Sequence, residues 1–216
     1  MIKRIFTLLF VCISLFVTAQ ELPFSGEIKA FKAQDSVEFP LRKSILFVGS
    51  SSFRMWHDLN QAFPGKRLIN RGFGGSSLPH VIEYADEIIL PYEPKQIVIY
   101  CGENDLVSDA VTAQIVADRF KELFSIIRKG MRRVPIVFVS IKPSPSRQHL
   151  MPKMKEANAL IKSFLENNRS TIFVNIWDQM LDQNGQPRKE LFLSDMLHMN
   201  PEGYAIWQKA LQPVLK

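Results

Sequence analysis

Short apolar runs that alternate with segments of helical periodicity constrain the fold of this chain more than any other feature. The five runs cover residues 44–48, 67–70, 96–101, 135–141 and 171–176. Three of them contain the sequences ILFV, IVIY and IVFV, which are continuously apolar, as in strands that helices cover on both faces. Alternating strands and helices are typical of βαβ units. The sequence therefore predicts an α/β domain with a five-stranded parallel sheet.

Helical periodicity marks the chain between and after the last three runs. Apolar residues recur every three or four positions between the third and fourth runs, where Gly130 ends the pattern, and again between the fourth and fifth runs. Pro201, a residue type favoured in the first turn of a helix, begins a final segment of the same kind. The apolar positions are Val116, Phe120, Leu123, Phe124 and Ile127, then Met154, Ala157, Ile161, Phe164 and Leu165, and finally Tyr204, Trp207 and Leu211.

The N-terminus has the features of a secretory signal. Lys3 and Arg4 precede a mostly apolar run at residues 5–17, and small residues lead to a predicted cleavage site after Ala19. The run is too short to span a bilayer, so we expect no stable membrane anchor. Removing 19 of the 216 residues would leave 197, the size of one domain. We expect a signal peptide at 1–19, a polar, extended lead-in at 20–43 and the folded domain at 44–216.

Composition and charge exclude several classes of protein. With 46% hydrophobic and 22% charged residues, the chain is neither disordered nor collagenous. The net charge of +6 falls to +4 when Lys3 and Arg4 leave with the signal, and this scattered excess predicts no nucleic-acid partner. Because Cys12 lies in the predicted signal, Cys101 remains alone, which excludes an intramolecular disulfide and a cysteine-based zinc site. The sequence is silent on oligomeric state.

Polar and glycine-rich segments follow the first three predicted strands, where open α/β sheets bind their ligands. The first is G-S-S-S at residues 49–52, which would place a serine hydroxyl at a helix N-terminus, as a reactive group or as an N-cap. The second is G-F-G-G-S-S at residues 72–77, which lets the backbone approach a ligand but is not a dinucleotide fingerprint. The third is G-E-N-D at residues 102–105, which an Asx-type turn would also explain.

A fourth polar motif, D-M-L-H at residues 195–198, lies near the C-terminus. Its spacing allows the Asp195 carboxylate and the His198 imidazole to meet on one turn of chain. Histidines also occur at positions 57, 80 and 149, but none of them has a carboxylate three residues ahead. A carboxylate that orients an imidazole produces a general base. His198 is therefore the candidate base.

Together, these four motifs resemble those of the SGNH hydrolase family, the GDSL-type esterases and acylhydrolases, over residues 44–212. The resemblance implies a flavodoxin-like three-layer α/β/α sandwich. It implies Ser51 as the nucleophile, with Asp195 and His198 completing the triad. It also implies an oxyanion hole made by the backbone amides of Ser51 and Gly75 and by the side chain of Asn104. The first motif is G-S-S-S rather than G-D-S-L, which leaves the adjacent serines at positions 50 and 52 as alternatives.

The residues around these motifs have less reactive expected roles. Residues 140–147 resemble a loop of bacterial GDSL-type esterases that carry a G-S-S-x-x-x-x-W first motif, and we expect them to form a wall of the cleft. Cys101 could be a thiol nucleophile, but a cysteine that ends an apolar strand is more often a small buried hydrophobe. Arg54 is expected on a solvated helix face or at the cleft rim. Trp56 is expected to pack against the first helix.

The resemblance implies an exported serine esterase that works through an acyl-enzyme, without a metal or an organic cofactor. Because the chain has no long insertion that could form a lid, we expect an open cleft and short acyl groups, acetyl first. Export to a periplasm or to the medium would give access to carbohydrate esters. The runner-up is a lysophospholipase-like acylhydrolase. A glycan-binding module without turnover also stays open, and thioesterase or protease-like acyl transfer would use the same groups.

Overall fold

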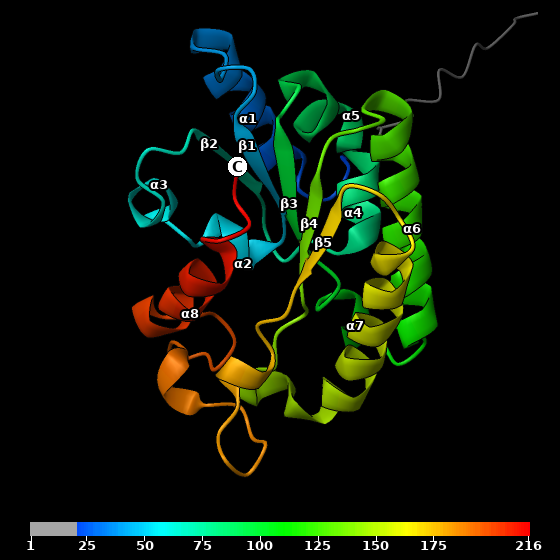
Figure 1. Ribbon diagram of the computed structural model, residues 1–216, viewed down its shortest axis with the longest axis vertical. Helices are drawn as coiled ribbons and strands as arrows, with labels where there is room; N and C mark the ends of the chain where they lie inside the picture. The colour runs from blue at the N-terminus through cyan, green and yellow to red at the C-terminus, as the bar shows by residue number, and fades with distance from the viewer. Residues whose placement is uncertain (1–20) are drawn as a thin grey trace, which may run out of the picture.

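The computed structural model describes residues 21–216 and has a five-stranded parallel sheet at its centre (Figure 1). The predicted strands are all present, with bounds within two residues of those expected. Their spatial order, β2-β1-β3-β4-β5, is the order of flavodoxin-like folds. The predicted α/β sandwich is therefore confirmed. The strands are β1 (Ile45–Gly49), β2 (Leu68–Gly72), β3 (Gln96–Tyr100), β4 (Ile136–Val139) and β5 (Thr171–Val174).

Helices cover both faces of the sheet and complete the three layers (Figure 1). Side chains of β1 alternate between two cores, with Leu46 and Val48 in one and Ile45 and Phe47 in the other. The first core is covered by α1 (Ser25–Val37), α4 (Leu78–Glu83), α5 (Ala85–Ile88), α6 (Ala113–Gly130) and α7 (Met151–Glu166). The second core is covered by α2 (Ser51–Arg54), α3 (Leu59–Ala62) and α8 (Pro201–Leu211). Short 3-10 turns lie at η1 (Leu90–Tyr92), η2 (Asp105–Val107), η3 (Pro145–Leu150), η4 (Asp178–Met180) and η5 (Lys189–Leu191).

The three segments of predicted helical periodicity form α6, α7 and α8. Two of these helices begin with a side-chain cap, and at the start of α6 the side chain of Thr112 accepts a hydrogen bond from the amide of Ile115. At the start of α8, Asn200 caps the amide of Gly203, and Pro201 takes the first helical position. None of the helices within residues 21–216 is long and apolar enough to cross a bilayer. The predicted signal at 1–19 lies outside the described residues.

The expectation of an extended lead-in at residues 20–43 is wrong, because most of this segment forms helix α1. Of the thirteen residues of α1, Ile28 alone is fully buried, so the sequence carries no clear apolar stripe. The helix is held by tertiary contacts instead. Asp35 pairs with the guanidinium of Arg71 and accepts a hydrogen bond from the hydroxyl of Tyr92, and both side chains of the ion pair are about nine-tenths buried. Packing rather than local propensity therefore fixes α1.

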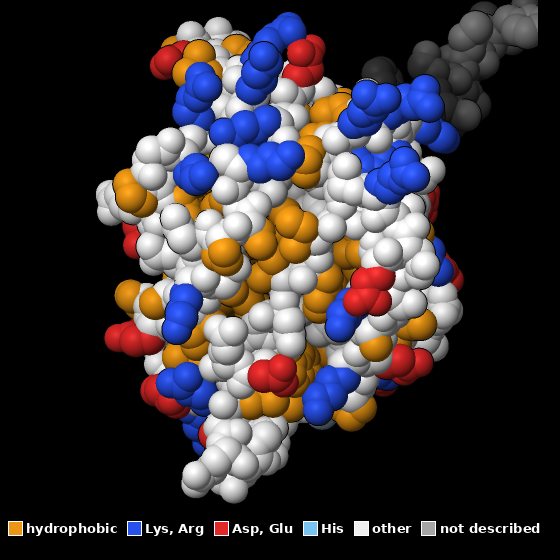
Figure 2. Space-filling view, in the orientation of Figure 1, with side chains coloured by type: hydrophobic (Ala, Val, Ile, Leu, Met, Phe, Trp, Pro, Cys, Tyr) orange, Lys and Arg blue, Asp and Glu red, His pale blue; other side chains and the backbone are white. Residues whose placement is uncertain are grey.

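Lysine and arginine side chains gather at the end of the molecule where the strands begin (Figure 2). At least one basic residue lies within three positions ahead of each strand, and parallel strands all begin at the same edge of a sheet. On the face shown in Figure 2, many basic side chains therefore lie at the end opposite the carboxyl ends of the strands, a clustering that the sequence did not indicate. The absence of a nucleic-acid partner stays a prediction. The residues are Arg42, Lys43, Lys66, Arg67, Lys95, Arg132, Arg133 and Arg169.

Candidate active site

The turn from β1 into α2 places Ser51 at the carboxyl end of β1, an interior strand of the sheet. Gly49 allows this turn, because its φ is +138° and a Cβ there would lie 1.9 Å from the carbonyl oxygen of Tyr100. The amide of Ser50 donates to the same carbonyl at 2.9 Å. Ser51 follows as the first residue of α2, where the free amides of the helix start favour negative charge.

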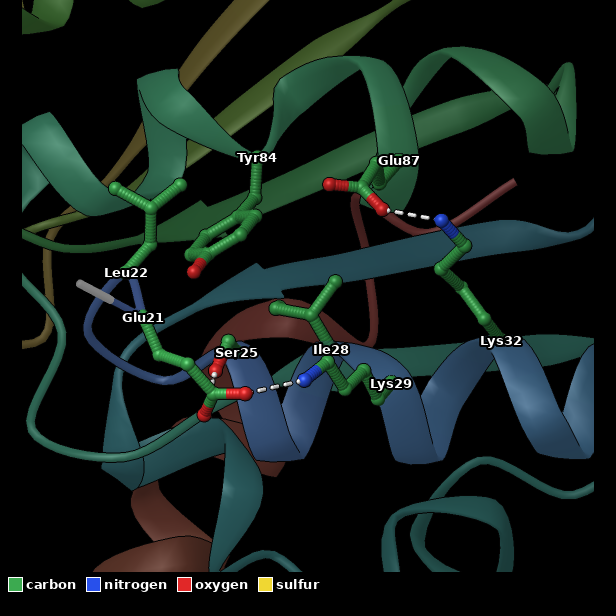
Figure 3. A pocket seen from close by; sticks show the side chains of 8 residues that line it. All are labelled: Glu21, Leu22, Ser25, Ile28, Lys29, Lys32, Tyr84 and Glu87. Carbon is green, nitrogen blue, oxygen red and sulfur yellow. Dashed lines mark hydrogen bonds and ion pairs between the residues drawn. The ribbon is translucent and has the colours of Figure 1, made fainter. Parts of the chain in front are cut away.

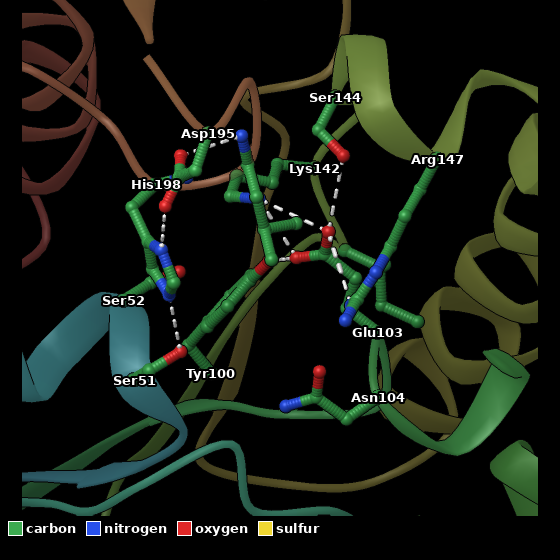
Figure 4. A network of polar contacts seen from close by, with 12 residues as sticks. Ser51, Ser52, Tyr100, Glu103, Asn104, Lys142, Ser144, Arg147, Asp195 and His198 are labelled. Carbon is green, nitrogen blue, oxygen red and sulfur yellow. Dashed lines mark hydrogen bonds and ion pairs between the residues drawn. The ribbon is translucent and has the colours of Figure 1, made fainter. Parts of the chain in front are cut away.

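Ser51, His198 and Asp195 form a continuous chain of hydrogen bonds (Figure 4). Ser51 Oγ lies 3.0 Å from His198 Nε2, and His198 Nδ1 lies 2.6 Å from Asp195 Oδ2. The other carboxylate oxygen of Asp195 accepts the backbone amides of Leu197 and His198, both at 2.9 Å. Burial alone would raise the pKa of Asp195, but the hydrogen bonds from His198 and Leu197 outweigh it and lower the pKa to about 2.

The loop that carries Asp195 and His198 is closed at its base. Phe192 and Met199 pair across an isolated antiparallel bridge, and the amide of Leu193 donates to the carbonyl of His198 at 2.8 Å. Between them, Met196 adopts a left-handed conformation with a φ of +55°. This closed turn brings the carboxylate and the imidazole together at the spacing of three residues that the sequence analysis singled out.

Of the three adjacent serines, Ser51 makes the hydrogen bond to His198. Ser52 is buried, and its carbonyl accepts a hydrogen bond from the hydroxyl of Tyr204 at 2.8 Å. Trp56 is buried in the core against α8, where its ring stacks on Tyr204 with centroids 4.9 Å apart. The neighbouring side chain of Arg54 is half exposed, and its Nε lies 3.8 Å from Glu27. The structure therefore gives Arg54 the solvated role expected of it, whereas Trp56 is packed as expected but against α8 rather than against the first helix.

Gly75 and Asn104 lie side by side on the loops that follow β2 and β3. Asn104 Nδ2 donates to the carbonyl of Ser76 at 3.0 Å, and an ideal Cβ on Gly75 would lie 3.8 Å from the same nitrogen. In Figure 4 this nitrogen points to the side of the site where Ser51 lies. The two loops are also joined through Asp105, whose carboxylate accepts the amide of Leu78 at 2.9 Å. Gly75 and Asn104, two of the three expected oxyanion-hole residues, are thus brought together.

Cys101 is fully buried beside these loops. Its Sγ lies 3.6 Å from the carbonyl of Ser76, and burial raises the pKa of the thiol well above its ordinary value. A thiol that is buried and protonated is a poor nucleophile, so Cys101 packs as the small hydrophobe that its position indicated. Among the residues the structure describes, no group of three or more His, Cys, Asp or Glu side chains is arranged to hold a metal ion.

Sequence reasoning missed a cluster of buried charges beside Asn104. Lys142 and Ser144 lie on the segment expected to form a cleft wall, yet they are 1% and 0% exposed and contact Glu103. It also missed Glu27, whose Oε1 accepts the amide of Gly74 at 3.1 Å from outside the expected domain. The available signal was weak: a glutamate within G-E-N-D and a lysine between apolar Ile141 and a proline.

Two hollows lie near these elements. A cavity of about 290 Å³ lies between the end of α2 and the start of α8, close to the loop of His198, and is lined by Met55, His57, Asp58, Leu193, Met199, Asn200, Pro201 and Tyr204. A larger one of about 400 Å³ lies between α1 and α5 (Figure 3), and its rim carries the ion pairs Lys29–Glu21 and Lys32–Glu87. Neither cavity is lined by a triad residue, but Leu193 and Met199 in the lining of the smaller one flank Asp195 and His198, so the smaller cavity is the better candidate for a substrate contact.

The chain matches the model of the GDSL-like lipase/acylhydrolase family over residues 44–206. Its fold is similar to that of a GDSL-like lipase from Bacteroides thetaiotaomicron, with a TM-score of 0.75, 18% identity, and coverage of 87% of this chain and 96% of that chain. A proposed platelet activating factor from Streptococcus pneumonia gives a TM-score of 0.77 at 22% identity, covering 88% and 92%. A catalytic mutant of an acetylxylan esterase from Geobacillus stearothermophilus gives 0.66 at 15% identity, covering 80% and 94%.

No curated protein sequence matched the chain. The family model nevertheless covers most of the chain and spans all four motifs. The resemblance noted from those motifs is therefore confirmed at the level of the family. The chain belongs to the GDSL-like lipase/acylhydrolase family and is a carboxylic ester hydrolase of that kind.

Proposed function

We propose that this protein is an exported serine esterase that removes short acyl groups, acetyl first, from carbohydrate esters. The observation that carries the proposal is the hydrogen-bonded chain from Ser51 Oγ through His198 to Asp195. A serine at 3.0 Å from an imidazole that a carboxylate orients is the arrangement required for an activated nucleophile.

In the proposed reaction, Ser51 Oγ attacks the ester carbonyl carbon while His198 Nε2 takes the hydroxyl proton. Asp195 stabilises the imidazolium that forms. The negative charge on the former carbonyl oxygen is met by the backbone amides of Ser51 and Gly75 and by Asn104 Nδ2. Collapse of the tetrahedral intermediate expels the alcohol, which receives the proton from His198. Water then attacks the acyl-enzyme by the same steps, which releases the acid and free Ser51.

Two observations support short acyl groups. The described segment from β1 to α8 carries no insertion large enough to form a separate lid over Ser51. Among proteins of similar fold, one is named an acetylxylan esterase, which makes acetylated xylan fragments a reasonable first substrate class to test. The runner-up is a lysophospholipase-like acylhydrolase. A clear preference for acyl chains of eight or more carbons over acetyl would favour it.

The first experiment is intact-mass analysis of the protein after reaction with a fluorophosphonate. We expect one adduct on the wild type and none on the folded Ser51→Ala variant, with Ser50→Ala and Ser52→Ala as matched controls that still react. An adduct that persists in Ser51→Ala would move the nucleophile to a neighbouring serine. No adduct on the wild type would favour a glycan-binding module without turnover.

Export is part of the proposal and has its own test. The signal predicted at residues 1–19 should be absent from the protein recovered outside the cytoplasm. N-terminal sequencing of that protein is expected to begin at Gln20, whereas recovery of the intact N-terminus from the cytoplasm alone would overturn export.

A further inference from the structure

A buried cluster of charges lies beside the candidate oxyanion hole and takes no part in the reaction described above (Figure 4). Its centre is the carboxylate of Glu103, which is 4% exposed. Lys142 Nζ donates to both carboxylate oxygens of Glu103, at 2.8 and 3.1 Å. Two hydroxyls complete the shell, with Tyr100 at 2.6 Å and Ser144 at 3.2 Å, and the guanidinium of Arg147 lies at 3.5 Å.

Every donor in this cluster is directed at one carboxylate, so the buried charge is fully satisfied. Burial alone would raise the pKa of Glu103, but Lys142 and Arg147 outweigh it and lower the pKa, which keeps the carboxylate ionised. Such a pair is weak evidence for stability, because desolvation of two charges offsets most of their attraction. What a satisfied buried network does provide is a single rigid geometry. The cluster therefore calls for a role other than stability.

The cluster joins the two loops that carry the catalytic groups. On one side, Glu103 is the residue directly before Asn104. On the other side, the ammonium of Lys142 lies 5.6 Å from the ring centroid of Phe192, at the base of the loop that carries Asp195 and His198. The same segment as Lys142 contacts that loop again, since the amide of Ser146 donates to the carbonyl of Met196 at 3.0 Å.

The segment that presents Lys142 is itself fixed from two sides. The side chain of Asn158 on α7 accepts the amide of Ile141 at 2.8 Å and donates to the carbonyl of the same residue at 2.9 Å. Ser140 Oγ accepts the amide of Ile176 at 3.0 Å, which ties the segment to the chain after β5. These hydrogen bonds fix the backbone beside Lys142, so its ammonium is a fixed partner for the carboxylate of Glu103.

We infer that the Glu103–Lys142 ion pair is a positioning device that holds the side-chain amide of Asn104 in the oxyanion hole and fixes it relative to the loop of Asp195 and His198. The inference rests on the proposed function of Asn104. Glu103 and Lys142 are positioning residues: neither contacts the reacting atoms, and both act through Asn104. Loss of the pair should lower kcat more than it changes KM, because the oxyanion contact forms chiefly in the transition state.

The test is a set of near-isosteric variants. Glu103→Gln leaves the buried ammonium of Lys142 unpaired, and Lys142→Met leaves Glu103 with only the more distant Arg147, so either change alone could lower the yield of folded protein. The double variant Glu103→Gln/Lys142→Met removes both charges at similar volume and is the one expected to fold. Its kcat on an acetyl ester should fall about ten- to a hundredfold, a loss that lies within the range of coupling between contacting residues.

The same double change is then made in an Asn104→Ala background. If the pair acts through Asn104, it should cost less than about twofold there, because the group it positions is already gone. An equal loss in both backgrounds would overturn the inference, and so would full activity of the folded double variant. Gln96→Met is the matched control, since it removes buried hydrogen bonds at the start of β3, the end of that strand away from Asn104, and should lower the melting temperature without changing kcat.

A second measurement separates this inference from the proposed function. The side-chain amide of Asn104 gives a pair of ¹H–¹⁵N signals that Asn104→Ala removes and thereby assigns. These signals should shift or broaden in the double variant and stay unchanged in Gln96→Met. An inactive wild type would overturn the proposed function, and the NMR signals would still test the positioning role. Unchanged Asn104 signals in the double variant would overturn that role.

Discussion

Glu27 on helix α1 accepts the backbone amide of Gly74 at 3.1 Å, so the N-terminal helix contacts the turn that carries Gly75. Phe24 strengthens this contact, because its ring packs edge-on against Phe73 with centroids 5.4 Å apart. The helix lies outside the segment matched by the family model, which begins at residue 44. An element added to the family domain thus buttresses one wall of the proposed oxyanion hole.

We therefore predict that Glu27→Ala lowers kcat. A hydrogen bond of this kind contributes about 1 kcal/mol, so a loss of about fivefold is expected if Gly75 shifts with its neighbour. Glu27→Gln keeps an acceptor oxygen and should retain most of the activity. Lys29→Ala, an exposed change on the same helix, is the control. Equal activity of Glu27→Ala and Lys29→Ala in steady-state assays would show that α1 only packs against the domain.

Asn104→Ala should slow turnover far more than Glu27→Ala. Removing one preorganised oxyanion donor typically costs about a hundred- to a thousandfold in kcat. The fold should persist, because Asn104 is only partly buried and its side chain donates a hydrogen bond to the carbonyl of Ser76 alone. Circular dichroism and the melting temperature check the fold, and kcat on an acetyl ester checks the prediction. An unchanged kcat would remove Asn104 from the proposed mechanism.

How far the sequence predicts this molecule can be judged from particular elements. The strands were recognisable because β1, β3 and β4 are buried on both faces, which makes each a continuous apolar run. Asp195 and His198 were recognisable because both belong to one short motif. In each case the information lies within a few neighbouring residues.

The features that the sequence did not reveal depend on partners that are far apart in the chain. Glu103 and Lys142 are 39 positions apart, and nothing local indicates that this lysine, rather than another, meets that carboxylate. Helix α1 also depends on distant partners, because a single fully buried residue among its thirteen leaves no periodic apolar stripe in the sequence. Charged side chains are ordinarily read as solvated, so buried charges become visible only when the tertiary structure brings their partners together.

The pKa of Asp195 gives a prediction for stability in acid. Its folded pKa of about 2 lies below the ordinary value of 3.8, so ionised Asp195 contributes stability above about pH 4 that is lost as the pH falls towards 2. The melting temperature of the wild type should exceed that of Asp195→Asn at pH 5 to 7, and the difference should shrink below pH 4. The effect should be small because the Asp195 side chain is 45% exposed. A difference that stays constant down to pH 2 would contradict the lowered pKa.

Gly49 is the position where the backbone leaves least room for change. Its φ of +138° is strained for any residue with a side chain, and a Cβ would lie 1.9 Å from the carbonyl oxygen of Tyr100 on the neighbouring strand. Since β1 and β3 are paired at this point, relief would require the sheet to open beside Ser51. We predict that Gly49→Ala destabilises the protein by about 3 kcal/mol or more and reduces the yield of folded protein.

Gly65 provides the matched control for this substitution. Its φ is +78°, but no atom lies within 4 Å of an added Cβ, so Gly65→Ala carries backbone strain without a steric clash. Strain of that kind costs about 1 to 2 kcal/mol. Urea denaturation of both variants should therefore give a much larger loss for Gly49→Ala. Equal losses would mean that the turn into α2 can relax to accept a side chain at position 49. Gly49 would then not be required for the position of Ser51.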